Sequence, residues 1–302
     1  MSVLSSGRVL VSGGSGFIGA WIIRRLLARG ITVRVLDARD DRRLVREIAG
    51  PAGDAVEWRI GDVSNTDTVM SAAEGCDIVA HLAAILTPAC RDNPIRGAEI
   101  NLIGTLNMFL AAKRYGMGRV VYMSSAGVFG PDNGHTPFPT THYGAFKLAC
   151  EGSARAFWED DAIASVGFRP LVVYGPGRES GLTAGPTLAC RAAARGESYA
   201  IPFSGMTDLI FVDDVAAAFE AALLSPFKGA HAFTMRGEMI DTAAVAEAIR
   251  AQVPGADIRA EGPLLPIAAE LAAGEIAKVL PGLPRTSVAA GIAATIAHYR
   301  GA

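Results

Sequence analysis

Tyr143 and Lys147 are two side chains that could move a proton together, and they lie four residues apart. On a helix, residues at this spacing share one face, so the phenol and the ammonium would be neighbours. A free tyrosine has a pKa of about 10, which is too high for a general base near neutral pH. An adjacent positive charge favours the phenolate and lowers that pKa. The pair therefore indicates acid/base chemistry, although an exposed amphipathic helix also contains such pairs by chance.

Ser125 is a hydroxyl that could assist this pair. It follows the apolar run Arg119–Met123, which predicts a buried strand. The carboxyl end of a parallel strand faces the crevice in which such sheets bind ligands. Ser125 could therefore hold a substrate oxygen while Tyr143 exchanges its proton. Ser124 is the weaker choice for this role.

A glycine-rich segment, Gly13–Gly19, lies between the first expected strand, Arg8–Val11, and a helical pattern from Gly16 to Arg29. It contains both the G-x-G-x-x-G and the G-x-x-G-x-x-G spacing. Side chains here would block the tight turn and keep the backbone away from a pyrophosphate. The following helix offers its free N–H groups and positive end to the anion. A flexible turn is the alternative, but the flanking strand and helix favour dinucleotide binding.

Asp37 follows the expected strand Ile31–Leu36, at the distance where a carboxylate hydrogen-bonds the ribose hydroxyls of adenosine. A carboxylate there repels the additional phosphate of NADP, so we expect NAD as the cofactor, with NADP less favoured. Nearby arginines, Arg39, Arg42 and Arg43, could weaken that preference or could simply be solvated.

Strands and helices must alternate to position these residues. Further strands are expected at Val56–Ile60, Asp77–Leu82 and Ala164–Phe168. Further helices are expected at Arg42–Ala49, Thr66–Ala73, Pro94–Tyr115, Tyr143–Trp158, Thr187–Arg195, Val212–Leu224, Ala243–Gln252 and Val288–Tyr299. This order predicts an α/β fold, a Rossmann-type doubly wound parallel sheet with a smaller C-terminal α/β substrate-binding part. We expect residues 1–174 to form the nucleotide-binding domain, rejoined by about 206–225, and residues 175–302 to be mostly the substrate-binding part.

The composition is that of a globular protein, with 302 residues, 50% of them hydrophobic, and a formal net charge of −2. The near-zero charge favours neither nucleic acid nor an anionic membrane surface, and no apolar run is long enough to cross a bilayer. The N-terminus lacks a signal-peptide pattern, and the four cysteines have no paired spacing. We therefore expect a cytoplasmic protein with reduced thiols, no metal site and a small-molecule substrate as its partner.

Further motifs follow one another in order along the chain. They are Gly61–Val63, His81–Ala84, Asn101–Thr105, Ser124–Gly130, Phe168–Pro170, Val173–Gly177 and Val212–Ala216. Together with the glycine-rich segment, Asp37, Tyr143 and Lys147, they resemble the extended short-chain dehydrogenase/reductase family, also called the NAD-dependent epimerase/dehydratase family. The resemblance extends over nearly the whole chain.

The resemblance implies roles for the matched residues. Tyr143 would be the general acid/base, Lys147 would bind the nicotinamide ribose and lower the tyrosine pKa, and Ser125 would orient the substrate oxygen. The cofactor contacts would be Gly13, Gly16, Phe17, Ile18, Gly19, Asp37, Asp62, Val63, Leu82, Ala83, Ala84 and Asn101, with Tyr143 and Lys147. Asn101 could instead support structure or a proton relay, and Phe129 stands where the family usually has Tyr. Helices Pro94–Tyr115 and Tyr143–Trp158 would form a homodimer through a four-helix bundle.

Two departures from the family concern the substrate. Members that act on sugar nucleotides commonly have Asn at the position of Val172 and Arg at that of Thr207, and both residues help to hold the diphosphate. Their absence favours a smaller substrate, such as a free sugar, a sugar acid or a polyol. Arg178 is the best candidate for an anion contact and Thr183 for a hydroxyl contact. The alternatives are a solvated arginine and a helix cap.

Three functions remain open. In a net dehydrogenase, a hydride passes between the nicotinamide and a carbinol carbon. In a sugar or sugar-nucleotide epimerase, the hydride returns to the other face of the same substrate. Both reactions use the same residues, so the missing diphosphate contacts favour the dehydrogenase only modestly. A non-catalytic dinucleotide-binding regulator is the third possibility, and the retained Tyr143, Lys147 and Ser125 argue against it.

Overall fold

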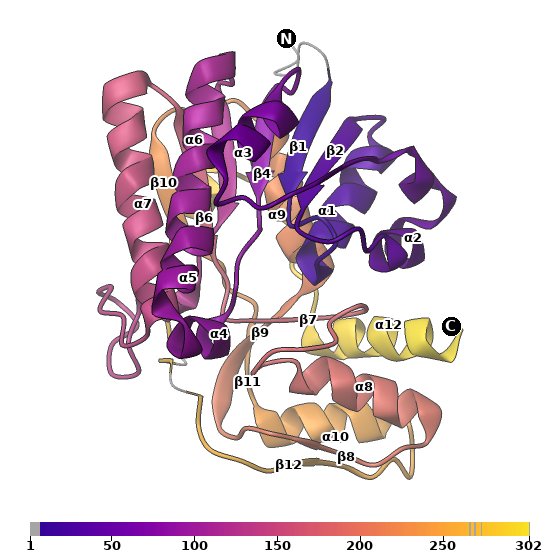
Figure 1. Cartoon of the computed structure of the whole chain (residues 1–302). Coiled ribbons are helices and arrows are strands. Elements are labelled where there is room, and N and C mark those ends of the chain that lie inside the picture. The colour runs from indigo at the N-terminus through magenta and orange to yellow at the C-terminus, as the bar shows by residue number, and fades with distance from the viewer. Residues whose placement is uncertain (1–6, 266, 269, 273, 302) are drawn as a thin grey trace.

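The main sheet of the computed structural model has seven strands, all parallel, in the order β10-β6-β5-β4-β1-β2-β3 (Figure 1). The structure describes residues 7–265, 267–268, 270–272 and 274–301. The strands are β1 (Arg8–Ser12), β2 (Thr32–Asp37), β3 (Glu57–Ile60), β4 (Ile78–His81), β5 (Arg119–Met123), β6 (Ala164–Arg169) and β10 (Ala230–Thr234). The strand order reverses between β1 and β4, which is where sheets of this kind bind ligands.

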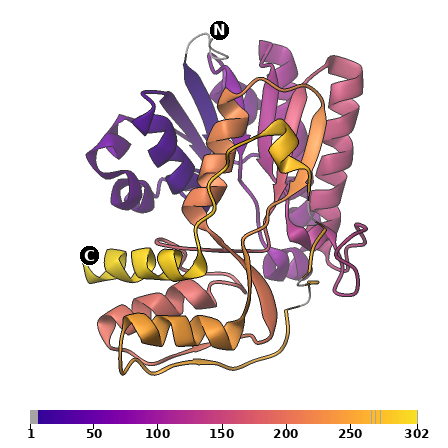
Figure 2. The ribbon, with the colours of Figure 1, turned by 180° about the vertical axis from the view of Figure 1, so that it is seen from behind.

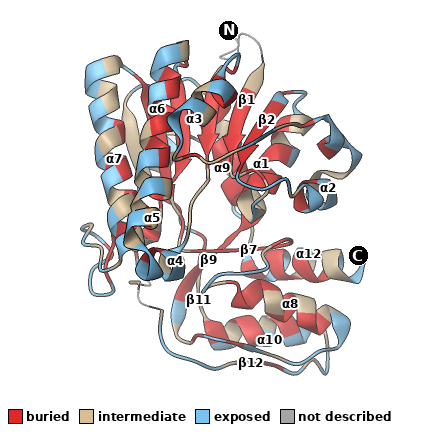
Figure 3. Cartoon of the chain, viewed as in Figure 1, coloured by how far each residue is buried: buried red, intermediate tan, exposed pale blue. Residues whose placement is uncertain are grey.

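Helices cover both faces of this sheet. On one face lie α3 (Thr66–Ala73), α6 (Gly104–Tyr115) and α7 (His142–Asp161), and on the other lie α1 (Phe17–Ala28) and α9 (Val212–Leu224), with α2 (Arg43–Ala49) beside α1 (Figures 1 and 2). The central strands are buried along their whole length because both faces are covered (Figure 3). The predicted doubly wound α/β class is therefore confirmed.

The expected helix Pro94–Tyr115 is present, and it contains a π turn that the sequence did not predict. It consists of α5 (Pro94–Ala98), a π turn (Glu99–Ile103) and α6, and a short helix, α4 (Thr87–Asp92), precedes it. At the π turn, the side-chain Nδ2 of Asn101 donates to the carbonyl oxygens of Gly97 (3.0 Å) and Ile85 (3.1 Å). These bonds stabilise a widened turn, which changes the helical phase too little to be read from apolar periodicity.

The smaller part of the molecule lies at the carboxyl edge of the main sheet (Figure 1). It contains a three-stranded sheet, β11-β9-β7, a two-stranded sheet, β12-β8, and three longer helices. Its elements are β7 (Val172–Tyr174), α8 (Gly185–Arg195), β8 (Tyr199–Ile201), β9 (Met206–Phe211), β11 (Glu238–Asp241), α10 (Thr242–Gln252), β12 (Ile258–Ala260) and α12 (Val288–Arg300), with the short α11 (Ile276–Val279) between the last two. The chain returns to the larger part through α9 and β10, and the domain division at residue 174 stays a prediction.

The loop after β7 is bonded both to the first helix of the chain and to the last. The indole of Trp21, on α1, donates to the carbonyl oxygen of Pro176 (3.0 Å), which joins the two parts. The amide of Gly177 donates to the hydroxyl of Tyr299 on α12 (3.1 Å), which fixes the same loop within the smaller part. No helix in the described part of the chain is long and apolar enough to cross a membrane.

His81, at the end of β4, is a buried histidine that the fold holds neutral. Its Nδ1 lies 2.6 Å from the hydroxyl of Ser12 and its Nε2 lies 3.0 Å from that of Thr105. Burial, and to a smaller extent the charge of Lys147, lowers its pKa from 6.5 to about 3. As the pH falls, the unfolded chain therefore binds a proton at this residue at a higher pH than the folded chain does.

We predict that this difference makes the protein acid-sensitive. Because the folded pKa is depressed, the contribution to stability is complete above the unfolded pKa and is lost as the pH falls from 6.5 towards 3. Thermal unfolding should begin several degrees lower at about pH 5 than at about pH 7.5. In His81→Gln, which carries no ionisable group there, the midpoint should shift less; an equal shift in both proteins would contradict the assignment.

Candidate active site

The glycine-rich loop between β1 and α1 approaches the chain after β4 too closely for side chains. Gly13 has a φ of +72°, and a Cβ on it would lie 2.7 Å from the amide nitrogen of Ala83. A Cβ on Gly19 would lie 2.5 Å from the carbonyl oxygen of Gly13. The glycines therefore allow a tight turn that ends at the N-terminus of α1, as a pyrophosphate site requires.

Two adjoining cavities, of about 320 and 470 Å³, open at the carboxyl ends of the strands and share Gly13, Ser15, Gly16, Arg39, Leu82 and Ala84. Among the residues expected to contact cofactor or substrate, the smaller cavity adds Asp37, Asp62, Val63 and Ala83, and the larger adds Phe17, Ile18, Gly19, Ser125, Tyr143, Arg178 and Thr183. Asn101 and Lys147 are buried and line neither cavity.

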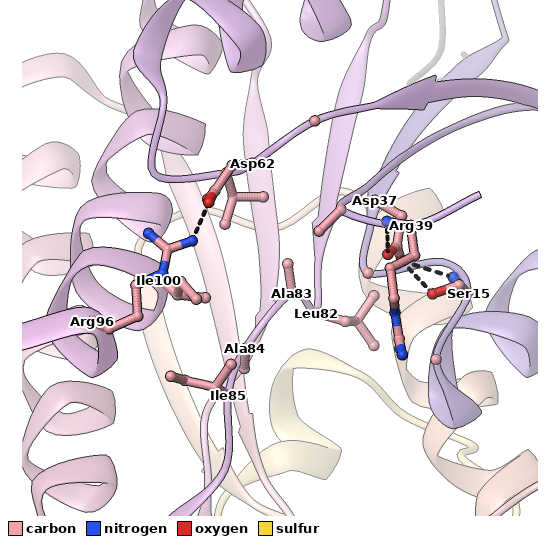
Figure 4. A pocket seen from close by; sticks show the side chains of 15 residues that line it. Ser15, Asp37, Arg39, Asp62, Leu82, Ala83, Ala84, Ile85, Arg96 and Ile100 are labelled. Atoms are coloured by element: carbon pink, nitrogen blue, oxygen red, sulfur yellow. Dashed lines mark hydrogen bonds and ion pairs between the residues drawn. The ribbon is translucent and has the colours of Figure 1, made fainter. Parts of the chain in front are cut away.

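Asp37 lies at one end of the smaller cavity and is joined to the glycine-rich loop (Figure 4). Its Oδ2 accepts hydrogen bonds from the backbone amide (3.0 Å) and the hydroxyl (2.7 Å) of Ser15. Arg42 and Arg43 are paired with Asp40 and Glu179 instead of pointing at this carboxylate. The sequence analysis missed Ser15, although a hydroxyl inside a phosphate-binding loop could have indicated it.

Asp62 lies on the other side of this cavity, beyond the segment Leu82–Ile85 (Figure 4). It accepts hydrogen bonds from the amide and the hydroxyl of Ser64, both 2.8 Å long, and pairs with the guanidinium of Arg96 on α5. Burial acts to raise the pKa of Asp62, but these bonds outweigh it and lower the pKa. Asp62 thus both caps a turn and lines the cavity. Nothing in the sequence pattern singled out Arg96, because it lies on a distant helix.

The two neighbouring serines after β5 have different partners. The hydroxyl of Ser124 is buried and donates to Glu151 (2.5 Å), whose carboxylate also pairs with Arg169. Both serines line the larger cavity with Tyr143, but Ser125 is only partly buried, and its hydroxyl accepts a hydrogen bond from the amide of Gly127 (3.0 Å). The hydroxyl of Ser124 is already engaged by Glu151, which favours Ser125, and the choice of Ser125 stays a prediction.

The electrostatics around Tyr143 differ from the expectation. Burial raises the pKa of its phenol to about 12, while a hydrogen bond with Ser125 and the charge of Arg178 act to lower it. Lys147 shares the helix face as expected, but its Nζ donates to the carbonyl oxygen of Met123 (2.7 Å) and lies 5.7 Å from the centre of the Tyr143 ring. The expected net lowering of the tyrosine pKa is therefore wrong for the chain alone, because desolvation outweighs the neighbouring charges.

Arg178 is a mostly buried cation on the loop after β7, not a solvated surface arginine. Its Nη1 donates to the carbonyl oxygen of Val173 (3.1 Å) and its Nη2 to the hydroxyl of Thr183 (2.8 Å). Burial lowers its pKa to about 10, so it remains charged at neutral pH. Within the described residues it has no carboxylate partner. Arg178 and Thr183 thus form one polar unit at the wall of the larger cavity.

Three comparisons with known proteins agree with one another. The model of the NAD-dependent epimerase/dehydratase family matches residues 9–235. The UDP-glucose 4-epimerase of Mycolicibacterium smegmatis is 32% identical over 227 residues, which is 71% of this chain and 72% of that protein. The crystal structure of a UDP-glucose 4-epimerase from Thermus thermophilus with NAD has a TM-score of 0.82 at 28% identity, covering 98% of this chain and 99% of that one. The L-threonine dehydrogenase of Cupriavidus necator has a TM-score of 0.84 at 22% identity, covering 97% and 99%, which shows the fold alone.

The close approach at Gly13 gives a prediction with a matched control. Gly13→Ala places a Cβ 2.7 Å from a backbone nitrogen, so the loop must move away from the chain after β4. Gly30→Ala imposes the same positive φ of +72° but meets nothing within 4 Å. Both variants should lose about 1 kcal/mol of stability through backbone strain, and only Gly13→Ala should bind the dinucleotide at least about tenfold more weakly.

Isothermal titration with NAD measures the affinity of each variant, and thermal unfolding measures its stability. Equal affinities in the two variants would show that the loop tolerates displacement at Gly13 and would contradict its role as a fixed cradle.

Proposed function

Because this chain belongs to the NAD-dependent epimerase/dehydratase family and is an NAD-dependent enzyme, we propose that it oxidises or reduces a secondary alcohol or ketone of a carbohydrate-like small molecule. The substrate would be a free sugar, a sugar acid or a polyol. One observation supports this most directly: Ser125 and Tyr143 line the same cavity as the glycine-rich loop. An acid/base pair for a substrate oxygen thus lies beside the expected site of the cofactor.

The residues present fit NAD. The glycine-rich loop leaves no room for a Cβ and presents the start of α1 to the pyrophosphate, and Asp37 lies at the rim where the adenosine ribose would bind. Asp62, Val63 and Ala83 line the remainder of the smaller cavity, which suits the adenine end. When bound, NAD supplies the hydride acceptor.

The chain's own residues would handle the oxygen and its proton. In oxidation, Tyr143 Oη takes the hydroxyl proton while Ser125 Oγ holds the same oxygen by a hydrogen bond. Lys147 is fixed by its bond to the carbonyl of Met123, with its Nζ 5.7 Å from the centre of the Tyr143 ring, and it would hold the nicotinamide ribose. In reduction, Tyr143 returns the proton to the carbonyl oxygen.

The positions of two residues support a substrate without a diphosphate. Val172 and Thr207 are buried, with 0% and 1% exposure, and line neither cavity. Because valine and threonine carry no charge, neither residue supplies a charge-assisted donor to a diphosphate. Similarity to UDP-glucose 4-epimerases favours the alternative, an epimerase with internal hydride return. The non-catalytic regulator, the third possibility from the sequence, is set aside because the chain is an NAD-dependent enzyme of this family.

A homodimer and a cytoplasmic location are further parts of this proposal. The helical segment from α5 through the π turn to α6 carries exposed apolar side chains, namely Ile95, Ile103 and Leu110. A four-helix bundle formed with a second copy would cover them.

We predict that the purified protein reduces NAD in the presence of a free sugar, sugar acid or polyol, followed as growth of the absorbance of reduced nicotinamide. NADP should be a poorer cofactor, because Asp37 repels its additional phosphate. UDP-sugars should give no net reduction. Saturable conversion of a UDP-sugar to its epimer, without net reduction of NAD, would support the epimerase instead.

We also predict that Tyr143→Phe binds NAD normally but turns over at least about a hundredfold more slowly, because the proton acceptor is lost. Because the phenol pKa is raised to about 12, kcat/KM for oxidation by the intact enzyme should rise with pH above neutrality. That rise should vanish in the variant. Tyr115→Phe, on α6 away from both cavities, is the control. Unchanged activity in Tyr143→Phe would remove this residue from the mechanism.

A further inference from the structure

The cavity that contains Tyr143 has a cation with no negative partner. Arg43, at the mouth of this cavity, is paired with Glu179 at 2.9 Å. Arg39 lines both cavities and lies beside Asp37 and Ser15 (Figure 4). Arg178 lines the wall next to Tyr143, and its only hydrogen-bond partners among the described residues are the neutral oxygens of Val173 and Thr183.

These partners orient the guanidinium without neutralising it. A guanidinium has five N–H groups, and the two bonds from Nη1 and Nη2 use two of them. The Nε–H is buried and has no partner within the described part of the chain. A buried cation that lacks a counter-charge is costly, so proteins pair such groups with a carboxylate or an anionic ligand. Thr183 Oγ1 and Val173 O hold this one pre-oriented at the cavity wall.

We propose that Arg178 is the receptor for a carboxylate of the substrate, and that the enzyme acts on a hydroxy acid whose carbinol carbon is within a few bonds of that carboxylate. The inference rests on the proposed oxidoreductase function and narrows its substrate class. The carbinol oxygen would lie between Ser125 and Tyr143 while the carboxylate pairs with Arg178. A planar fork of N–H donors suits the two oxygens of a carboxylate, which adds orientation as well as affinity.

The reaction balances with the residues and cofactor already named. In oxidation the carbinol C–H bond breaks and its hydride passes to NAD, which is reduced. The O–H proton passes to Tyr143 Oη, and the carbon–oxygen bond becomes a carbonyl. The carboxylate is unchanged and stays on Arg178, so the product is an oxo acid.

Arg178 could instead contact the phosphates of the dinucleotide, because its guanidinium lies 5.7 Å from the ring of Phe17 at the start of α1. The two roles differ in what a neutral variant loses. Loss of a substrate receptor weakens binding of the acid and leaves NAD binding intact. Loss of a cofactor contact weakens NAD binding and affects all substrates alike.

The experiment compares aldonates, uronates and short hydroxy acids with their primary amides, matching polyols and phosphorylated polyols. Wild type, Arg178→Gln, Arg178→Lys and the exposed control Arg195→Gln are each assayed for NAD reduction and for NAD affinity. Thermal unfolding checks that each variant is folded. We expect wild type to prefer an acid over its amide by at least about tenfold in kcat/KM.

In Arg178→Gln the preference for the acid over its amide should disappear. The KM for the acid should rise by about tenfold to a hundredfold, and the affinity for NAD should be unchanged. Arg178→Lys should recover part of the preference, and Arg195→Gln should resemble wild type. Efficient oxidation of neutral polyols with no preference for the acids would overturn the inference while the proposed function stands. A preference for phosphorylated polyols, or a weaker NAD affinity in Arg178→Gln with the acid preference kept, would also overturn it.

If no compound reduces NAD, the proposed oxidoreductase function fails. The role of Arg178 as a carboxylate receptor is then tested separately, by measuring ligand binding with calorimetry. Acids should then bind to the protein–NAD complex more tightly than their amides in wild type and not in Arg178→Gln. Equal binding of acid and amide to wild type would overturn the inference in that case as well.

Discussion

The crevice depends on the contact between the end of β1 and the end of β4. Ser12, which is fully buried, accepts a hydrogen bond from the amide of Leu82 to its carbonyl oxygen (3.0 Å), and its hydroxyl lies 2.6 Å from His81 Nδ1. One residue later the chain turns at Gly13, where a Cβ would collide with Ala83. The two strand ends are thus held closer than side chains would allow, at the point where the strand order reverses. The cradle for the dinucleotide is a consequence of that spacing.

The remaining functional groups are attached to neighbouring strand ends. Ser125 follows β5 directly, and Lys147 is tied to the same strand by its bond to the carbonyl of Met123. That bond ties α7 to the end of β5, and Tyr143, one helical turn earlier on α7, lines the cavity. Arg178 comes from the smaller part of the molecule, on a loop held to α1 through Trp21. The larger part therefore supplies the group that we propose for acid/base chemistry, and the smaller part supplies the group that we propose for substrate selection.

Short-range patterns revealed much of this arrangement in the sequence. The glycine-rich segment, Asp37 and Ser125 could each be found because strand, turn and helix succeed one another within a few residues. Other features depend on contacts between distant segments. The pairing of Asp62 with Arg96 and the π turn around Asn101 leave no local trace, since each depends on which side chains the fold brings together. The sequence can name candidate groups, but their neighbours decide which of them faces the cavity.

Burial explains why the pKa of the tyrosine could not be estimated from its nearest charged neighbour in sequence. Burial shifts Tyr143, Lys147 and Arg178 towards their neutral forms: it raises the phenol pKa to about 12 and lowers the pKa of both cations. The same low dielectric strengthens the attraction between a phenolate and each nearby cation. The phenolate that remains when Tyr143 loses its proton is therefore stabilised more by Arg178 than it would be in water. The phenol of Tyr143 and the guanidinium of Arg178 thus influence each other's charge state across the cavity wall.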